Sequence, residues 1–173
     1  MEDTITKTSI QGLVLIKRPT LVDNRGFFRE PVRIRELEDV TGIKFDVKQM
    51  NHARSSRNTL RGIHIAPWNK LIYAVRGRVQ VVAVDFREGS GTYGKYESFI
   101  IGEDNRASIF VPKGIGNSYL VLSEEADYAY LTDDEWTPER ERGVAWNDPT
   151  LNIPWQLDGE PVLSDKDKNN PNL

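Results

Sequence analysis

The sequence contains no cysteine and only two histidines, His52 and His64, among its 173 residues. Without cysteine the chain cannot form disulfides, thiolate nucleophiles or cysteine-ligated zinc or iron–sulfur sites. Two histidines are too few for a three-histidine metal site, and no spacing of carboxylates points to magnesium. We therefore expect a protein that works with no metal and no cofactor.

The sequence also lacks a block of positive charge and a long apolar run. Its 23 basic and 26 acidic residues are spread along the chain and give a net charge of −3, whereas nucleic-acid binders usually concentrate basic residues. No apolar run approaches the roughly 20 residues of a membrane helix. The first seven residues are polar and acidic, unlike a secretory signal. We expect a cytoplasmic protein that binds neither nucleic acid nor membranes.

Short runs of β-branched and aromatic residues, separated by turn residues, fill the middle of the chain. Residues 71–75 and 79–86 flank Arg76-Gly77, which predicts a hairpin. Further strands are expected over residues 96–101, 107–111, 119–122 and 126–131, and a helix over residues 32–41. This pattern predicts an all-β fold, a jelly-roll sandwich or barrel with little helix; it does not separate a jelly roll from an immunoglobulin-like sandwich.

The C-terminal part differs from the rest because prolines recur in it. Pro149, Pro154, Pro161 and Pro171 follow Asn147 and predict an extended wrap rather than a strand array. The length fits a single domain over residues 1–173. Residues 165–173 are polar, and we expect them either to complete this domain or to form a loose tail.

One histidine lies among residues suited to proton transfer. His64 follows Arg61 by three residues, and Lys70 comes after a short turn. A histidine, with a pKa of about 6.5, can act as a base near neutral pH, and neighbouring cations can stabilise an oxyanion or hold a phosphate. On spacing alone, a purely structural histidine is the more ordinary interpretation, so these residues do not by themselves establish a function.

Six motifs in order add to this pattern. They are Asp23 to Glu30 (DNRGFFRE), Gln49-Met50-Asn51 with Ser55-Ser56, Leu60 to His64 (LRGIH), Val84 to Arg87 (VDFR) with Thr92-Tyr93-Gly94, Trp146 to Pro149 (WNDP) with Ile153-Pro154-Trp155, and Leu163 to Asp167 (LSDKD). Together they resemble the dTDP-4-dehydrorhamnose 3,5-epimerase family from about residue 12 to residue 167.

The resemblance implies a cupin-type jelly-roll barrel and a cofactor-independent isomerase. Members of this family invert carbons 3 and 5 of a nucleotide-linked 4-keto-6-deoxyhexose, turning dTDP-4-dehydro-6-deoxyglucose into dTDP-4-dehydrorhamnose for polysaccharide biosynthesis. The resemblance also implies a homodimer in which the N-terminal segment around Arg25 to Glu30 is exchanged between subunits.

The resemblance further implies roles for individual residues. His64 falls on the position of the base, Asp167 on that of the aspartate that orients it, and Lys70 on that of the lysine near the oxyanion. Tyr130 falls on the position of the acid that returns a proton to the opposite face. The expected substrate contacts are Arg25, Phe28, Glu30, Gln49, Asn51 and Arg61, together with Asn117 and Trp136 near the nucleotide and sugar.

Two of these positions depart from the family pattern. Gly116-Asn117-Ser118-Tyr119 stands where the family usually has Ala-His-Gly-Phe, and Trp136 stands where many members have tyrosine. The departures leave open a single-carbon epimerase or an epimerase of GDP-linked 4-keto-heptoses. A non-catalytic sugar-nucleotide-binding cupin is an alternative of another class, disfavoured because all four proposed catalytic residues are present.

Overall fold

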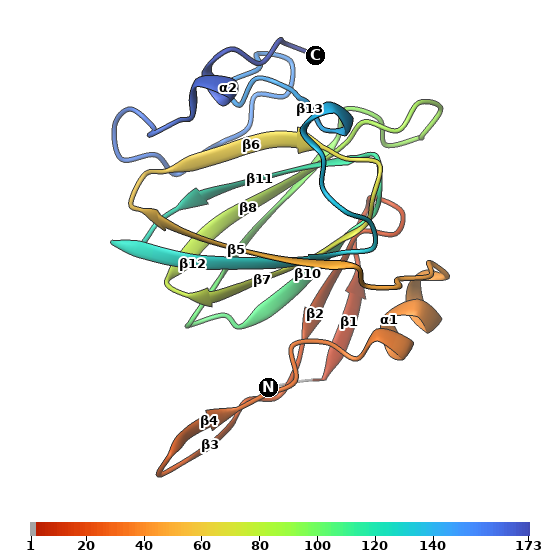
Figure 1. The fold of residues 1–173 in the computed structure, drawn as a ribbon, viewed down its shortest axis with the longest axis vertical. Coiled ribbons are helices and arrows are strands. Elements are labelled where there is room, and N and C mark those ends of the chain that lie inside the picture. Colours follow the sequence, from red (N-terminus) through yellow and green to blue (C-terminus); the bar gives the residue numbers. More distant parts are fainter. Residues whose placement is uncertain (1–2) are drawn as a thin grey trace.

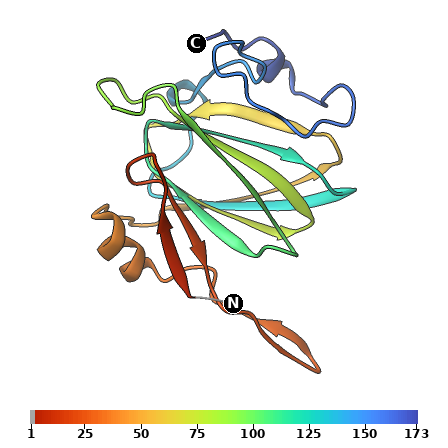
Figure 2. The ribbon, with the colours of Figure 1, turned by 180° about the vertical axis from the view of Figure 1, so that it is seen from behind.

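The computed structural model describes residues 3–173, and two antiparallel β-sheets facing one another dominate it (Figures 1 and 2). The first sheet contains, in spatial order, β1 (Thr4–Lys7), β2 (Val14–Lys17), β10 (Ala107–Val111), β7 (Lys70–Arg76), β12 (Glu125–Thr132) and β5 (Gln49–Ser56). The second contains β13 (Arg142–Gly143), β6 (Leu60–Ile65), β11 (Ile115–Val121), β8 (Arg78–Asp85) and β9 (Tyr96–Gly102). The predicted all-β fold is confirmed.

Apolar side chains from both sheets fill much of the space between them. Ile72 and Ile109 of the six-stranded sheet pack with Val81 of the five-stranded sheet, all fully buried. Because successive side chains of a strand point to opposite faces, every second residue of these strands enters the barrel. This core sets the spacing between the two sheets.

Helix α1 (Ile34–Thr41) covers the outer face of the six-stranded sheet. Its buried residue Leu37 packs with Val14 and Phe110. The helix ends at Gly42, whose φ of 69° is the left-handed conformation that glycine adopts easily at a helix C-terminus. The helix predicted over residues 32–41 is thus confirmed, with a start two residues later. No helix within the described residues is long and apolar enough to cross a membrane.

The C-terminal region covers the outer face of the five-stranded sheet. Val144, Leu151 and Trp155 pack on residues of β6 and β8. After the 3-10 helix η1 (Pro138–Arg140) and β13, the chain runs without strands until a short helix, α2 (Asp165–Lys168), above β6 (Figure 1). The residues after α2 are hydrogen-bonded to the rest of the protein, for example through the Leu173 backbone N–H, which donates to Asp148 at 2.7 Å.

The prediction of a hairpin around Gly77 is wrong. β7 pairs with β10 and β12 in one sheet, whereas β8 pairs with β11 and β9 in the other. The chain crosses between sheets at Gly77, which has a φ of 76° and where a Cβ would lie 2.2 Å from the Glu125 carbonyl oxygen. Gly77 is a turn residue, as the sequence predicts, but the local sequence does not say whether the next strand returns to the same sheet.

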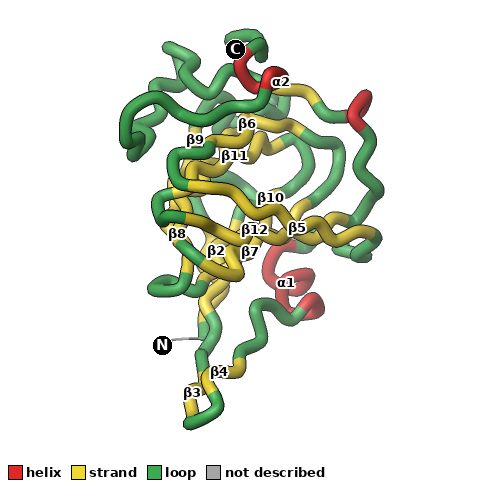
Figure 3. Tube along the Cα trace, turned by 60° about the vertical axis from the view of Figure 1, so that its left-hand side comes forward, coloured by secondary structure: helices red, strands yellow, loops and turns green. Residues whose placement is uncertain are grey.

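A short hairpin projects away from the barrel at the end remote from α2 (Figure 3). It consists of β3 (Leu21–Asp23) and β4 (Gly26–Phe28). Val22 is 76% exposed and Phe28 66% exposed. Such a concentration of exposed apolar side chains on a two-stranded ribbon indicates a contact surface.

The buried carboxylate of Asp85 organises the loop that follows β8. It accepts hydrogen bonds from Arg87 Nε at 2.8 Å, Ser90 Oγ at 2.7 Å and Thr92 Oγ1 at 2.6 Å. Burial alone would raise the pKa of Asp85, but these donors hold it well below the usual range of a carboxyl group.

We expect Asp85→Asn to destabilise the fold by about 3 kcal/mol near neutral pH, because it leaves Arg87 without its buried partner. A carboxylate with a depressed pKa contributes stability above its unfolded pKa, about 3.9, and loses that contribution as the pH falls through the folded pKa. The difference between the two proteins in urea unfolding should therefore shrink below about pH 4. Asp46→Asn, which removes an exposed partner of Lys48, is the control and should change little. Equal stability of Asp85→Asn and the unsubstituted protein would contradict the stabilising role of the pair formed by Asp85 and Arg87.

Candidate functional site

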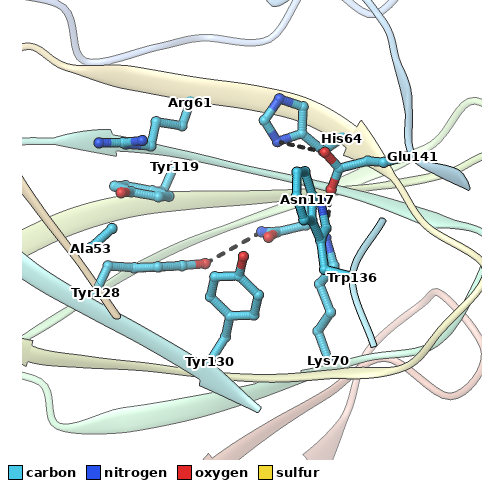
Figure 4. Close-up of a pocket in the computed structure, with 10 residues that line it drawn as sticks. All are labelled: Ala53, Arg61, His64, Lys70, Asn117, Tyr119, Tyr128, Tyr130, Trp136 and Glu141. Atoms are coloured by element: carbon cyan, nitrogen blue, oxygen red, sulfur yellow. Dashed lines mark hydrogen bonds and ion pairs between the residues drawn. The ribbon is translucent and has the colours of Figure 1, made fainter. Parts of the chain in front are cut away.

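A polar cavity of about 210 Å³ lies between the two sheets (Figure 4). It continues into a groove of about 540 Å³ that passes β6 toward α2. Four residues border both spaces: Arg61, His64, Trp136 and Glu141. The other residues lining the cavity are Ala53, Lys70, Asn117, Tyr119, Tyr128 and Tyr130.

His64 lies on β6, and the carboxylate of Asp167 fixes its orientation. His64 Nε2 is 2.7 Å from Asp167 Oδ1. The backbone N–H of Asp167 donates to Ser164 Oγ at 3.1 Å, which caps α2 and places the carboxylate over β6. Burial alone would raise the pKa of Asp167, but His64 lowers it below the ordinary value. An ionised Asp167 accepts the Nε2 proton and leaves the other ring nitrogen, Nδ1, free as a base.

Glu141 faces that second ring nitrogen. Its carboxylate lies 4.0 Å from His64 Nδ1, 3.7 Å from Lys70 Nζ and 3.1 Å from Lys166 Nζ. The Glu141 side chain is only 8% exposed. It is a buried anion between three groups that can carry positive charge.

The two buried partners in this cluster shift one another's ionisation. Burial lowers the pKa of Lys70, and the charge of Glu141 opposes that fall. Burial raises the pKa of Glu141, but His64, Lys70 and Lys166 outweigh it and leave the pKa below the ordinary value. Glu141 therefore stays negative near neutral pH, and it favours the charged form of Lys70.

Tyr130 approaches the cavity from the opposite wall. It lies on β12 of the six-stranded sheet, whereas His64 lies on β6 of the five-stranded sheet, and Figure 4 shows the tyrosine hydroxyl pointing into the space between them. Lys70 Nζ lies 5.8 Å from the centre of the Tyr130 ring. Burial and the nearby charge of Glu141 raise the pKa of Tyr130, so its hydroxyl keeps its proton and can donate it.

Two further tyrosines and an amide line the inner part of the cavity. Tyr119 and Tyr128 stack with ring centres 3.9 Å apart. Asn117 Nδ2 donates to the Tyr128 hydroxyl at 3.4 Å (Figure 4). Asn117, where the family pattern has histidine, thus binds a buried phenol and adds no further base to the cavity.

Gln49 and Asn51 lie on β5, beside Tyr130 and its neighbours on β12. Gln49 Nε2 donates to Asn51 Oδ1 at 2.7 Å, and Gln49 Oε1 accepts from the Trp136 backbone N–H at 2.9 Å. Gln49 therefore holds the loop that carries Trp136. Asn51 Nδ2 is buried and makes no hydrogen bond within the described residues.

Five of the expected substrate contacts do not line the cavity or the groove: Gln49 and Asn51 are two of them, and the other three lie elsewhere on the chain. Arg25 bonds to Asp23 in the projecting hairpin, Phe28 is exposed on the same hairpin, and Glu30 pairs with Arg33. None of the three lines the cavity or the groove. In one chain they cannot touch a ligand that is bound beside His64.

The structure adds residues that sequence reasoning missed. Glu141 lies in the run Glu139-Arg140-Glu141-Arg142, which is typical of a solvated segment, so no signal marked it as buried. Lys166 lies next to Asp167 within the LSDKD motif, and that adjacency was the available signal. The second histidine, His52, lies outside the site and pairs with Asp127 at 3.0 Å on the outer side of β5.

Comparison with known proteins gives consistent matches. The model of the dTDP-4-dehydrorhamnose 3,5-epimerase family matches residues 7–173. The dTDP-4-dehydrorhamnose 3,5-epimerase of Pseudomonas aeruginosa is 39% identical over 166 residues, which cover 94% of this chain and 92% of that protein.

Solved structures give the same picture. A dTDP-6-deoxy-D-glucose-3,5-epimerase from Legionella pneumophila, in complex with dTDP-4-keto-L-rhamnose, superposes with a TM-score of 0.93 at 35% identity, over 98% of this chain and 92% of that one. A 3′-monoepimerase from Streptomyces bikiniensis, in complex with dTDP-quinovose, gives a TM-score of 0.90 at 35% identity, over 95% and 85% of the two chains. These neighbours settle the fold as the jelly roll and not the immunoglobulin-like alternative.

We expect Glu141→Gln and Lys166→Gln to move the pKa of Lys70 in opposite directions. Removing the negative charge of Glu141 should lower that pKa further, whereas removing the positive charge of Lys166 should raise it. Carbon-13 NMR titration of protein labelled at the lysine Cε measures both shifts, and each variant is the control for the other. An unchanged Lys70 in Glu141→Gln would contradict the proposed charge coupling.

Proposed function

The chain belongs to the dTDP-4-dehydrorhamnose 3,5-epimerase family, and from this premise we propose that it inverts carbons 3 and 5 of a dTDP-linked 4-keto-6-deoxyhexose. The observation that carries the proposal is the placement of a histidine and a tyrosine on opposite walls of one cavity, with a buried lysine on the cavity wall. Inversion at carbon requires removal of a proton from one face and its return to the other.

The chemistry follows from the ketone at carbon 4. It acidifies the protons on carbons 3 and 5, so a base can remove either one and leave an enolate. His64 takes the proton through Nδ1, and Asp167 stabilises the imidazolium that forms. The Lys70 ammonium stabilises the enolate oxygen. Tyr130 then donates its proton to the opposite face of the carbon, and the ketone forms again.

We propose that the other residues expected to contact the substrate hold its nucleotide and sugar. Arg61 is exposed at the junction of cavity and groove, where a diphosphate would bind, and Trp136 offers an aromatic face to a base. Asn51 Nδ2 is buried and makes no hydrogen bond within residues 3–173, so it could donate to a hydroxyl or carbonyl oxygen of the sugar. The reaction needs no metal and no cofactor, and we place it in the cytoplasm.

We propose that the working enzyme is a homodimer in which the β3–β4 hairpin reaches the neighbouring subunit, bringing Arg25, Phe28 and Glu30 to that subunit's site. The exposed apolar residues of the hairpin support this. An apolar groove of about 250 Å³ on the outer face of the six-stranded sheet, lined by Met50, Leu71 and Tyr73 among others, offers a surface for them. Arg29, stacked over Tyr73, is buried with no hydrogen-bond partner within residues 3–173, so an acceptor from a second copy would satisfy it.

The activity is tested by proton NMR of dTDP-4-keto-6-deoxyglucose with the protein in deuterated water. We expect deuterium to enter at carbons 3 and 5. His64→Asn should slow the exchange by roughly 10²–10⁴-fold, because the base is lost, while thymidine diphosphate still binds. Tyr130→Phe should still exchange, but with the original configuration kept, because only the face served by His64 remains available.

Other results of that experiment identify the alternatives. Exchange at carbon 3 alone would replace the proposal by a single-carbon epimerase, the activity named for the Streptomyces bikiniensis neighbour. Exchange only with GDP-linked 4-keto sugars would change the nucleotide. No exchange with either class, despite binding, would indicate a non-catalytic sugar-nucleotide-binding cupin.

The dimer is tested by replacing Phe27 and Phe28 together with serine. We expect sedimentation analysis to show a dimer for the unsubstituted protein and a shift toward monomer for the variant, because two exposed aromatic side chains of the hairpin are lost. Tyr93→Ser, which removes an aromatic side chain 49% exposed elsewhere, is the matched control and should leave the dimer intact. A monomeric unsubstituted protein, or an unchanged dimer in the double variant, would contradict the exchange.

A further inference from the structure

The Arg61 side chain is held from the opposite sheet. Arg61 lies on β6, in the five-stranded sheet, and its Nε–H donates to Ser55 Oγ at 3.1 Å. Ser55 lies on β5, the edge strand of the six-stranded sheet, and is 6% exposed. The bond therefore joins the two sheets beside the short connection, residues 57–59, that leads from β5 to β6.

Ser55 is itself fixed by an aromatic side chain. Its Oγ lies 3.3 Å from the Tyr119 hydroxyl. Tyr119 faces Arg61 across the β6–β11 pair, and its ring stacks on the fully buried Tyr128. Because the stacked rings are enclosed in the core, the Tyr119 hydroxyl is a rigid anchor for Ser55.

The guanidinium held in this way still lacks a counter-ion. Arg61 forms no ion pair with a carboxylate within residues 3–173, although it borders both the cavity and the groove. With Nε bound to Ser55, no carboxylate within residues 3–173 pairs with its two terminal nitrogens, and a guanidinium binds a phosphate bidentately through such a pair of parallel donors.

We infer that Ser55 and Tyr119 are positioning residues that fix the Arg61 guanidinium so that its terminal nitrogens bind the diphosphate of the substrate. This inference rests on the proposed function and concerns the same site. Ser55 acts through Arg61, and it takes no part in the proton transfers of His64 and Tyr130. Loss of the Ser55 hydroxyl should therefore weaken binding and leave the chemical steps intact.

The test measures binding of thymidine diphosphate, inorganic pyrophosphate and thymidine by calorimetry, and kcat and KM by proton exchange. Ser55→Ala should raise the Kd of thymidine diphosphate and of pyrophosphate about 3- to 10-fold, as expected for the net contribution of one ordinary hydrogen bond that acts through Arg61. Thymidine binding and kcat should stay within about twofold of the unsubstituted protein, because only the contact with the diphosphate changes. Tyr119→Phe, which keeps the ring stack, should produce a smaller change in the same direction.

Two controls separate positioning from a general effect on the fold. Ser9→Ala removes an exposed hydroxyl that is bonded to Glu97 and lies outside the cavity and the groove, and it should bind like the unsubstituted protein. Ser55→Thr keeps the hydroxyl and should restore affinity. In an Arg61→Met background, Ser55→Ala should cause no further loss, because its effect passes through the guanidinium.

The possible failures are distinguishable. Unchanged diphosphate binding in Ser55→Ala, or an equal loss in the Arg61→Met background, would overturn the inference and leave the proposed epimerase intact. Unchanged binding in Arg61→Met would overturn both this inference and the assignment of the diphosphate site. Loss of exchange at carbons 3 and 5 in the unsubstituted protein would count against the proposed function alone.

Discussion

The separation of the two sheets is the constraint on which the site depends. Face-to-face sheets pack about 10 Å apart, and in this protein His64 projects from one sheet while Tyr130 projects from the other. Elsewhere in the barrel, residues such as Ile72 and Val81 fill that space completely. Around His64 the side chains between the sheets are mostly polar or aromatic, and a cavity of about 210 Å³ remains. The apolar core keeps the walls at the distance that an acid and a base on opposite faces of one sugar require.

A second constraint is electrostatic. Buried charges are costly unless they are paired, yet the proposed chemistry needs a buried cation beside the enolate. Glu141 resolves this conflict because it lies within 4.0 Å of both His64 and Lys70. Lys166, which is 46% exposed, pairs with it from the solvent side. Glu141 thereby favours the charged form of Lys70 in a place where burial favours its neutral form. The cluster joins β7, the segment before β13, and α2 in one network.

The parts of the fold predicted from the sequence are those set by local patterns. Runs such as residues 107–111 are rich in β-branched and aromatic residues and end at turn residues, so the sequence predicts this strand with the bounds that the structure has. The sheet to which each strand belongs depends on contacts distant in sequence, which is why the crossing at Gly77 was taken for a hairpin.

In the site, His64, Lys70, Tyr130 and Asp167 could be named through the family resemblance, and the structure brings them to one cavity and its rim. Glu141 could not, because its importance comes from burial that a local charge run conceals. Arg25, Phe28 and Glu30 lie away from the cavity in a single chain, and no local sequence pattern says whether they contact a second copy.

The extended C-terminal region ties the orientation of His64, the proposed base, to completion of the fold. Asp167 reaches His64 from 103 residues away in sequence, and it is held there by its own helix cap at Ser164 and by the hydrogen bond of the Leu60 backbone N–H to Val162. Further along, Asn170 donates to Asp167 at 3.3 Å, and Leu173 is bonded to Asp148. A barrel without this wrap would still carry a histidine on β6, but that histidine would lack the Asp167 carboxylate at Nε2. The wrap also buries the outer face of the five-stranded sheet through Leu151 and Trp155. The same segment therefore stabilises the sheet and orients His64. Changes that loosen it should lower the stability of the fold and slow the proposed proton transfer together.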